Sequence, residues 1–252
     1  MNNVILQAHE LFKTGGFDYV ICGGFGIEMH AGRELRTHGD FDIAVFIEDR
    51  QKVVQFLLDN DWPVYGRYGE AGPIWQYLFY KINDITDRYW NDLRNVWAVK
   101  PNCTPEMYKL ERLQGGWLDA ANPAFPCNRD VYSYKQPTEW LVQSLDFVEV
   151  AFDMRDGNDY VARENPRVTR SLDKAILYRD SIPYLAPEII LFYKADKYSS
   201  TNPYAKPRTE IDFKAIMPIL SGESRQWLIS ALDAAYPDGY EWLENLLEVK
   251  QR

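Results

Sequence analysis

Apolar residues change their spacing several times in the first part of the chain, and each change indicates a new element. Where they recur at intervals of three and four they predict an amphipathic helix, and short unbroken runs predict buried strands. Glycine pairs separate these segments. The predicted order is helix, strand, glycine turn, short helix, strand and helix, over residues 3–13, 19–22, 23–24, 26–32, 41–46 and 49–58.

Beyond this region the pattern falls into three parts. Residues 63–140 are rich in Tyr, Trp, Gly and Pro and have no sustained period, apart from short candidate strands at 74–82 and 95–99. They predict hairpins and long loops. Residues 145–153 alternate between apolar and acidic or small side chains, which is typical of a strand. From Pro187 onward, helical patterns are separated by Pro, Gly and Ser.

These elements predict an α/β (α+β) fold, in which a mixed β-sheet flanked by helices is followed by a helical C-terminal part. We expect one domain over residues 1–180, with an aromatic-rich insert at about 63–140, and a helical domain over residues 181–252. The chain has 252 residues, of which 46% are hydrophobic, so it can bury a core of the size that this fold requires.

Composition narrows the classes of partner. The formal net charge of -9 disfavours DNA or RNA as the main partner, because nucleic-acid binders use basic patches, whereas it suits a cationic small molecule. Three cysteines without CxxC spacing predict neither a disulfide framework nor a zinc site. No apolar stretch approaches the roughly 20 residues of a membrane span, and the N-terminus lacks the pattern of a signal peptide. We therefore expect a cytoplasmic protein without a membrane partner.

Gly23 and Gly24 stand where the first strand gives way to a helix. Backbone N–H groups can converge on a phosphate at such a place, and a side chain would obstruct its approach. Glycines also occur in tight turns for conformational reasons alone. The pair therefore indicates either a phosphate-binding turn or an ordinary tight turn.

Asp40 and Asp42 flank Phe41 at the start of the second strand. Residues i and i+2 of a strand point to the same face, so the two carboxylates are expected side by side. Two like charges at that distance destabilise each other unless a cation neutralises them, and oxygen ligands favour Mg²⁺. The pair predicts a metal site, and a solvated turn with an aspartate cap is the alternative.

Glu149 and Asp153 share one face of the alternating strand, with Ala151 between them. A third carboxylate from this strand would complete a site for two Mg²⁺ ions, one holding a triphosphate and the other binding an acceptor hydroxyl. For either acid, the exposed polar face of an antiparallel strand is the alternative. The spacing alone does not choose between Glu149 and Asp153.

Four short motifs, Gly-Gly, Gly-Arg, Arg-x-His and Asp-x-Asp, occur together and in this order within residues 23–46. This segment, GGFGIEMHAGRELRTHGDFDIAVF, resembles the signature of the DNA polymerase beta-like nucleotidyltransferase superfamily, particularly its aminoglycoside and lincosamide adenylyltransferases. Segments of the C-terminal half, such as SIPYLAPEIILFYKADK, are also similar to adenylyltransferase-like nucleotidyltransferases. The resemblance covers roughly residues 17–62 and 145–235.

The resemblance implies a minimal nucleotidyltransferase fold and transfer of AMP from Mg-ATP to a hydroxyl of a small molecule, with an aminoglycoside-like acceptor and a role in antibiotic resistance. It implies that the glycine turn contacts phosphate and that Asp40 and Asp42 bind Mg²⁺. The third acid of the family stands between two hydrophobic residues. Glu149, between two valines, matches that position better than Asp153, which remains the alternative.

The resemblance also points to basic residues. Arg33, Arg36 and His38 match positions between the motifs, where they either orient the turn or touch phosphates. Lys194 and Lys197 are three residues apart on one predicted helix, so both could reach a triphosphate from one face, although isolated helix lysines often do little.

Asp212 matches an acid of the family that would position one of these lysines. The lysine of the family's own stretch is missing here, because Arg208 and Thr209 stand in that region.

The aromatic insert is longer than its counterpart in the family, which leaves the acceptor open. It offers aromatic side chains for an acceptor wall and two acids, Asp84 and Asp87, that could meet amines. Most such aromatic residues belong to cores, and that is the preferred interpretation. The candidates for the wall are Trp75, Tyr77, Tyr80, Tyr89, Trp90 and Trp97.

Two other functions remain open. One is a nucleotidyltransferase that modifies a protein or a tRNA, for which Arg163, Arg167, Arg170 and Lys174 would have to form a basic patch. The other is a nucleotide-binding or scaffold protein without catalysis, which the intact Asp40 and Asp42 disfavour.

Overall fold

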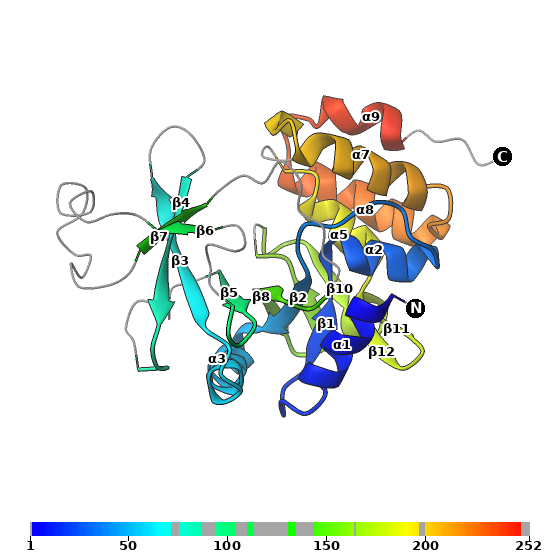
Figure 1. Ribbon diagram of the computed structural model, residues 1–252. Coiled ribbons are helices and arrows are strands. Elements are labelled where there is room, and N and C mark those ends of the chain that lie inside the picture. Colours follow the sequence, from blue (N-terminus) through cyan, green and yellow to red (C-terminus); the bar gives the residue numbers. More distant parts are fainter. Residues whose placement is uncertain are drawn as a thin grey trace.

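A computed structural model describes residues 2–71, 76–86, 94–103, 110–112, 131–134, 144–163, 165–196 and 200–247 (Figure 1). The helices are α1 (Asn3–Phe12), α2 (Gly23–Ala31), α3 (Arg50–Asp59), α4 (Leu172–Ala175), α5 (Pro187–Tyr193), α7 (Ala205–Ile216), α8 (Gly222–Ala235) and α9 (Glu241–Leu247), with a 3-10 turn at Ile47–Asp49. The strands are β1 (Tyr19–Ile21), β2 (Asp42–Phe46), β3 (Val64–Ala71), β4 (Gln76–Ile82), β5 (Asn95–Val99), β6 (Leu110–Arg112), β7 (Val131–Tyr134), β8 (Phe147–Asp156), β9 (Asp159–Val161), β10 (Thr169–Ser171), β11 (Ile176–Arg179) and β12 (Ile182–Leu185).

The strands form a mixed sheet in the order β11-β12-β1-β2-β8-β5-β3-β4-β7-β6, and β9 joins β8 to β10 at one side. The pairs β1–β12 and β2–β8 are parallel, and the other pairs are antiparallel. Helices flank this sheet and further helices follow it, so the predicted α/β fold class is confirmed.

Two apolar clusters lie on opposite faces of the central strands. Because side chains alternate along a strand, Ile43 and Val45 of β2 join the cluster that α1 and α3 cover, whereas Ala44 and Phe46 join the cluster formed by α5, α7, α8 and α9. Both faces of β2 are therefore buried apart from its first residue, Asp42, which is partly exposed.

The first elements match the sequence pattern closely. Helix α1 begins after Asn2, whose side chain accepts a hydrogen bond from Val4 N–H at 2.9 Å. Helix α2 begins at Gly23, three residues before the predicted start, with Cys22 as its N-cap. The glycine pair is therefore the first turn of the helix, because the absence of side chains lets that turn lie close to the neighbouring strand and loop.

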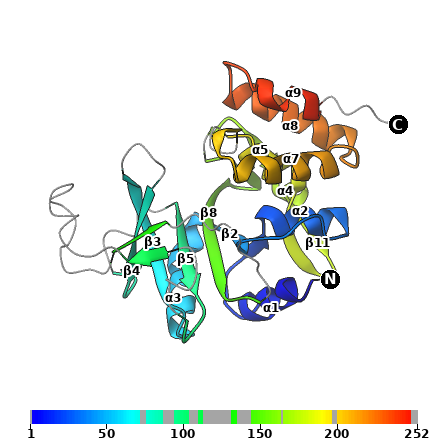
Figure 2. The same cartoon turned by 45° about the horizontal axis from the view of Figure 1, so that its top comes forward.

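The strands of the insert extend the sheet away from the C-terminal helices, as both views show (Figures 1 and 2). The candidate strand at 95–99 is confirmed as β5, and β4 covers most of the other one. Tyr80 and Trp97 are 1% and 5% exposed, so they belong to the core and not to an acceptor wall. Asp84 is exposed. The side chains of Trp75, Tyr77, Asp87, Tyr89 and Trp90 lie outside the described residues.

The C-terminal helices pack on the face of the sheet that carries Asp42. Strand β12 still belongs to the sheet, with Tyr184 opposite Ile21, so the helical part begins at Pro187. The division into domains at residue 180 stays a prediction. No helix in the described ranges is long and apolar enough to span a membrane.

The central position of Ile43 makes it a test of this packing. Ile43 is fully buried between α1, α3 and the sheet, so Ile43→Ala should lower the free energy of unfolding by roughly 2–5 kcal/mol. Ile219→Ala, at a residue that is 52% exposed, should change it by less than about 0.5 kcal/mol. Urea unfolding measures both, and equal effects would contradict the assigned core.

Candidate functional site

The parallel pairing of β2 with β8 brings two acids together. Asp42 is the register partner of Glu149, and Glu149 N–H donates to the carbonyl of Phe41 at 2.9 Å. Register partners point to the same face of a sheet, so both carboxylates lie side by side on the face that the C-terminal helices cover. Asp40 precedes this strand by two residues and is partly exposed.

The same register separates Asp153 from this pair. Asp153 is the partner of Phe46, four residues further along β8, which corresponds to roughly 13 Å along the strand. Asp153 lies instead beside the hydroxyl of Tyr160, which donates to Tyr193 at 2.9 Å. Glu149 accepts a hydrogen bond from the amide of Asn95. The geometry therefore favours Glu149 as the third acid.

Gly23 lies against the carboxylate of Asp42. A Cβ atom on Gly23 would be 1.8 Å from Asp42 Oδ2, and its φ of +58° disfavours any side chain. Cys22 N–H donates to the Asp42 carbonyl at 3.0 Å, which fixes the strand beside the turn. A Cβ atom on Gly24 would be 2.3 Å from His38 Nδ1. The first turn of α2 therefore passes between Asp42 and His38, and only glycine fits there.

The thiol of Cys22 shows which charges gather at this turn. Burial raises its pKa well above the ordinary value, and the carboxylates of Asp42, Asp153 and Glu149 raise it further, whereas the ammonium of Lys194 lowers it. The pKa of this one thiol thus depends on acids of β2 and β8 and on a cation at the end of α5.

The arrangement suits Mg²⁺ held together with a phosphate. Among the residues that the structure describes, no three His, Cys, Asp or Glu side chains form a group that could hold a metal ion by themselves. Mg²⁺ typically takes one or two protein carboxylates and completes its shell with waters and substrate phosphates. Asp42 and Glu149 offer such a pair of hard oxygen ligands next to the N-terminal turn of α2.

Asp212 of α7 anchors two cations at the site. Its carboxylate is 1% exposed and receives both Nε and an Nη atom of Arg36 at 2.9 Å, while Lys194 Nζ lies 3.0 Å away. Burial alone would raise the pKa of Asp212, but Lys194 and Arg36 outweigh it and lower the pKa. The pKa of Arg36, which burial alone would lower, is raised by Asp212, Asp40 and Glu28.

Glu28 organises the loop that leads to β2. It is 5% exposed, lies 2.8 Å from His38 Nε2 and accepts a hydrogen bond from Leu35 N–H at 2.7 Å. The ring of His38 stacks on Phe25 with 4.2 Å between centroids. The sequence analysis missed Glu28, although a single acid among the apolar residues of a buried helix was a usable signal.

The predicted basic residues divide into two groups. Arg36 and His38 are engaged by Asp212 and Glu28, so they orient the loop. Arg33 is exposed and lines another cavity with Glu34 and Arg179.

Lys194 reaches the site from the C-cap of α5, because that helix ends at Tyr193 and does not continue as predicted. The backbone tightens at this end, because Ala195 N–H donates to the carbonyl of Phe192, three residues back, at 3.2 Å. Lys197 lies outside the described residues.

Residues 4–64 match the model of a family described as aminoglycoside-2''-adenylyltransferase. This segment contains α1, the glycine turn, the loop with Arg36 and His38, and Asp40 and Asp42. The match confirms the resemblance that the motifs indicated, and it identifies this part of the chain as similar to adenylyltransferase-like nucleotidyltransferases.

A comparison with solved structures aligns the chain with several proteins at low identity. Lincomycin-bound LnuA, a lincosamide antibiotic adenylyltransferase, has 14% identity and a TM-score of 0.43, over 84% of this chain and 96% of that one. The antibiotic-resistance factor ANT(2'')-Ia in solution has 11% identity and a TM-score of 0.43, over 93% and 90%. An antigenic nucleotidyltransferase-like protein from Paracoccidioides brasiliensis has 14% identity and a TM-score of 0.40, over 99% and 92%. A comparison with curated protein sequences finds no match.

The contacts of Asp212 predict a dependence of stability on pH. Its pKa is lower in the folded than in the unfolded chain, so its stabilising effect is complete above the ordinary value of 3.8 and is lost as the pH falls below it. Asp212→Asn leaves two buried cations without their anion and should cost about 3 kcal/mol at neutral pH. Urea unfolding should show a smaller difference between variant and wild type at pH 3 than at pH 7.

Glu210→Gln is the matched control on the same helix. Glu210 forms an exposed pair with Lys214, so this variant should stay within about 0.5 kcal/mol of the wild type. An equal loss in both variants, or a loss for Asp212→Asn that does not change with pH, would contradict the assigned role.

Proposed function

We propose that the chain is a Mg²⁺-dependent nucleotidyltransferase that moves AMP from ATP to a hydroxyl of a small molecule. The observation that carries this proposal is the placement of the Asp42 and Glu149 carboxylates beside the glycine turn at the start of α2. Two adjacent carboxylates destabilise each other unless a cation neutralises them. At a helix N-terminus without side chains, backbone N–H groups can donate to a phosphate. The family match over residues 4–64 supports the same chemistry.

The turn and the cations would hold the triphosphate. The N–H groups at Gly23 and Gly24 would donate hydrogen bonds to phosphate oxygens at close range because no Cβ atom intervenes. Lys194, fixed by Asp212, would supply a positive charge, and Lys197 is proposed as a second one. Arg36 lies beside Gly24 and holds the loop in place. Arg33 and His38 are the other two basic residues proposed to orient the turn or touch phosphates.

The carboxylates would assemble the reacting groups. Asp40, Asp42 and Glu149 are the proposed ligands of two Mg²⁺ ions, which neutralise phosphate charge when bound. In the transfer, the acceptor oxygen forms a bond to the α-phosphorus while the bond to the bridging oxygen breaks and pyrophosphate leaves. The hydroxyl proton passes to a neighbouring carboxylate, for which Glu149 is our candidate. Positioning and electrostatics supply most of the rate in this class of reaction.

An aminoglycoside-like, cationic acceptor is the first choice. The matching family acts on such a molecule according to its description, and a protein with a net charge of -9 attracts cations. A role in antibiotic resistance follows only if this acceptor is right.

A tRNA acceptor is less favoured by the described residues. Of the proposed basic patch, Arg170 is buried against Glu188 at 2.6 Å, and Lys174 pairs with Glu223. Arg163 donates to the carbonyl of Arg94. Arg170 is thus withdrawn from the surface and the exposed Lys174 is neutralised by an acid, whereas a polyanion would need unbalanced cations on one surface.

Binding of a nucleotide is the direct test of the proposal. A non-hydrolysable ATP analogue should bind in the presence of Mg²⁺, and Asp40→Asn combined with Asp42→Asn should weaken that Mg²⁺-dependent binding at least tenfold. Asp59→Asn and Asp61→Asn, outside the site, serve as the matched pair of controls. Isothermal titration with and without Mg²⁺ measures these affinities, and wild-type protein that binds no nucleotide under either condition would overturn the proposal.

Transfer activity distinguishes the two candidates for the third acid. With ATP and a panel of aminoglycosides, Glu149→Gln should lower pyrophosphate release at least a hundredfold, because the glutamine keeps the contact with Asn95 but neither binds Mg²⁺ nor accepts a proton. Asp153→Asn should stay within about tenfold of the wild type, since it is roughly 13 Å further along β8. The reverse order of effects would assign the role to Asp153.

A further inference from the structure

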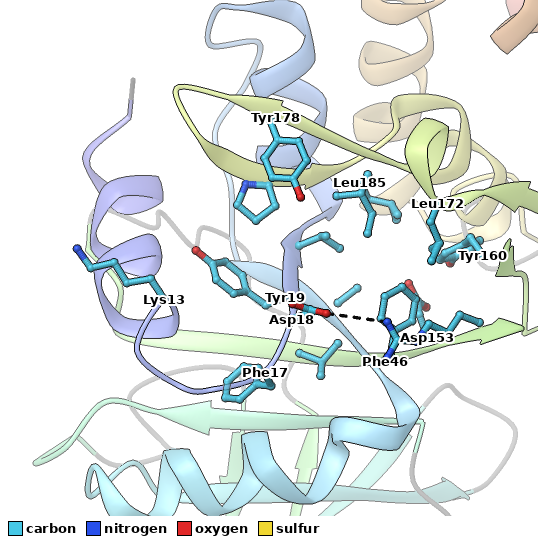
Figure 3. A pocket seen from close by; sticks show the side chains of 16 residues that line it. Lys13, Phe17, Asp18, Tyr19, Phe46, Asp153, Tyr160, Leu172, Tyr178 and Leu185 are labelled. Atoms are coloured by element: carbon cyan, nitrogen blue, oxygen red, sulfur yellow. Dashed lines mark ion pairs between the residues drawn. The ribbon is translucent and has the colours of Figure 1, made fainter. Parts of the chain in front are cut away.

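A cavity of about 310 Å³ lies at the opposite end of the sheet face that carries Asp42 (Figure 3). It opens where β1 begins and where β2 and β8 end, below the β11–β12 hairpin. Phe46 and Asp153, which are register partners, form part of its wall. These residues are four positions, or roughly 13 Å, further along their strands than Asp42 and Glu149, although the charge of Asp153 still acts on the Cys22 thiol at the glycine turn.

The wall of the cavity is mostly apolar, with one polar corner. Aliphatic side chains such as Ile176 and Leu185 line it together with aromatic rings. At the corner, the carboxylate of Asp153 meets the hydroxyl of Tyr160, a residue that is 1% exposed. Burial and this carboxylate both raise the pKa of Tyr160, so the phenol stays neutral beside Asp153. A ligand would meet an apolar slot that ends at a carboxylate.

The charged residues that line the cavity are two acids, Asp18 and Asp153, and two bases, Lys13 and Arg155. Both bases have acidic partners: Lys13 pairs with Glu10 at 2.6 Å, and Arg155 pairs with Glu48 and lies 3.9 Å from Asp18. Asp153 is therefore the charge at the polar corner that a positively charged ligand would meet.

Aromatic rings near the opening add a second attraction for a cation. Tyr178 of β11 is 69% exposed and points toward the cavity, and Tyr19 and Phe46 line it from β1 and β2 (Figure 3). The guanidinium of Arg155 lies 4.5 Å from the centroid of Phe46 and covers that ring, so Tyr19 and Tyr178 are the rings that a ligand cation would meet.

We propose that this cavity binds a small apolar amine, with its hydrocarbon or aromatic part in the slot and its ammonium group directed to Asp153. The volume lies at the lower end of the range of small-molecule sites, which limits the ligand to the size of one or two rings. The inference does not depend on the transferase activity, because it concerns binding at the other end of the strands.

The test compares three probes that share a phenylethyl group and differ in the charge of the end group. Phenethylamine should bind at least tenfold more tightly than 2-phenylethanol, and 3-phenylpropionate should bind more weakly than both. Asp153→Asn should weaken phenethylamine binding at least fivefold, and Tyr178→Ala should weaken it at least twofold. Isothermal titration at low salt, supported by ligand-detected NMR, measures these differences.

Two control variants locate the binding. Asp238→Asn removes one exposed acid outside the cavity, and Asp42→Asn removes one at the other end of the sheet face. Both should keep the affinity for phenethylamine within twofold, which separates a local contact from a general effect of charge.

Three results would overturn the inference: no measurable binding of phenethylamine, equal affinity for the amine and the alcohol, or an affinity that falls with Asp42→Asn as much as with Asp153→Asn. Circular dichroism checks that each variant is folded. If Asp153→Asn does not fold, two measurements still decide the question. They are the affinity of Tyr178→Ala, which changes an exposed residue, and the affinities of the wild type for the three probes.

Discussion

The register between β2 and β8 is the constraint on which the candidate site depends. It places Asp42 opposite Glu149, and the mutual repulsion of these carboxylates is a cost that the fold accepts. The turn at Gly23 comes so close to Asp42 that a methyl group would not fit, so the glycine turn and this acid are in contact without an intervening side chain. Because the strands are buried on both sides of this pair, the acids cannot move apart without disturbing the core.

One sheet face thus carries two different environments along its length. At one end, carboxylates, glycines and the C-terminal cations make a hydrophilic site that suits a metal and a phosphate. At the other end, aliphatic and aromatic side chains enclose a slot with a single acid in its corner. Asp153 lines this slot, although its side chain points to the same sheet face as that of Glu149 on the same strand.

Much of the fold could be predicted from the sequence, because the helices and strands around residues 3–58 and 145–153 have clear periodicity. The pairing of strands could not be predicted in the same way, since the partner of Asp42 depends on a strand more than a hundred residues later. The motifs indicated Asp40, Asp42 and Glu149, but nothing local showed that Arg36 would meet Asp212. Aromatic residues such as Tyr80 and Trp97 carry no signal that distinguishes a core from a binding wall.

Asp212 holds Arg36 and Lys194 in ion pairs that are largely shielded from water, because its carboxylate is 1% exposed and the two cations are 10% and 21% exposed. Salt screens exposed charges over about 10 Å at 0.1 M ionic strength but affects buried ones much less. The hold of Asp212 on both cations therefore persists in concentrated electrolyte, whereas the attraction of the acidic exterior for cations would fade as the ionic strength rises.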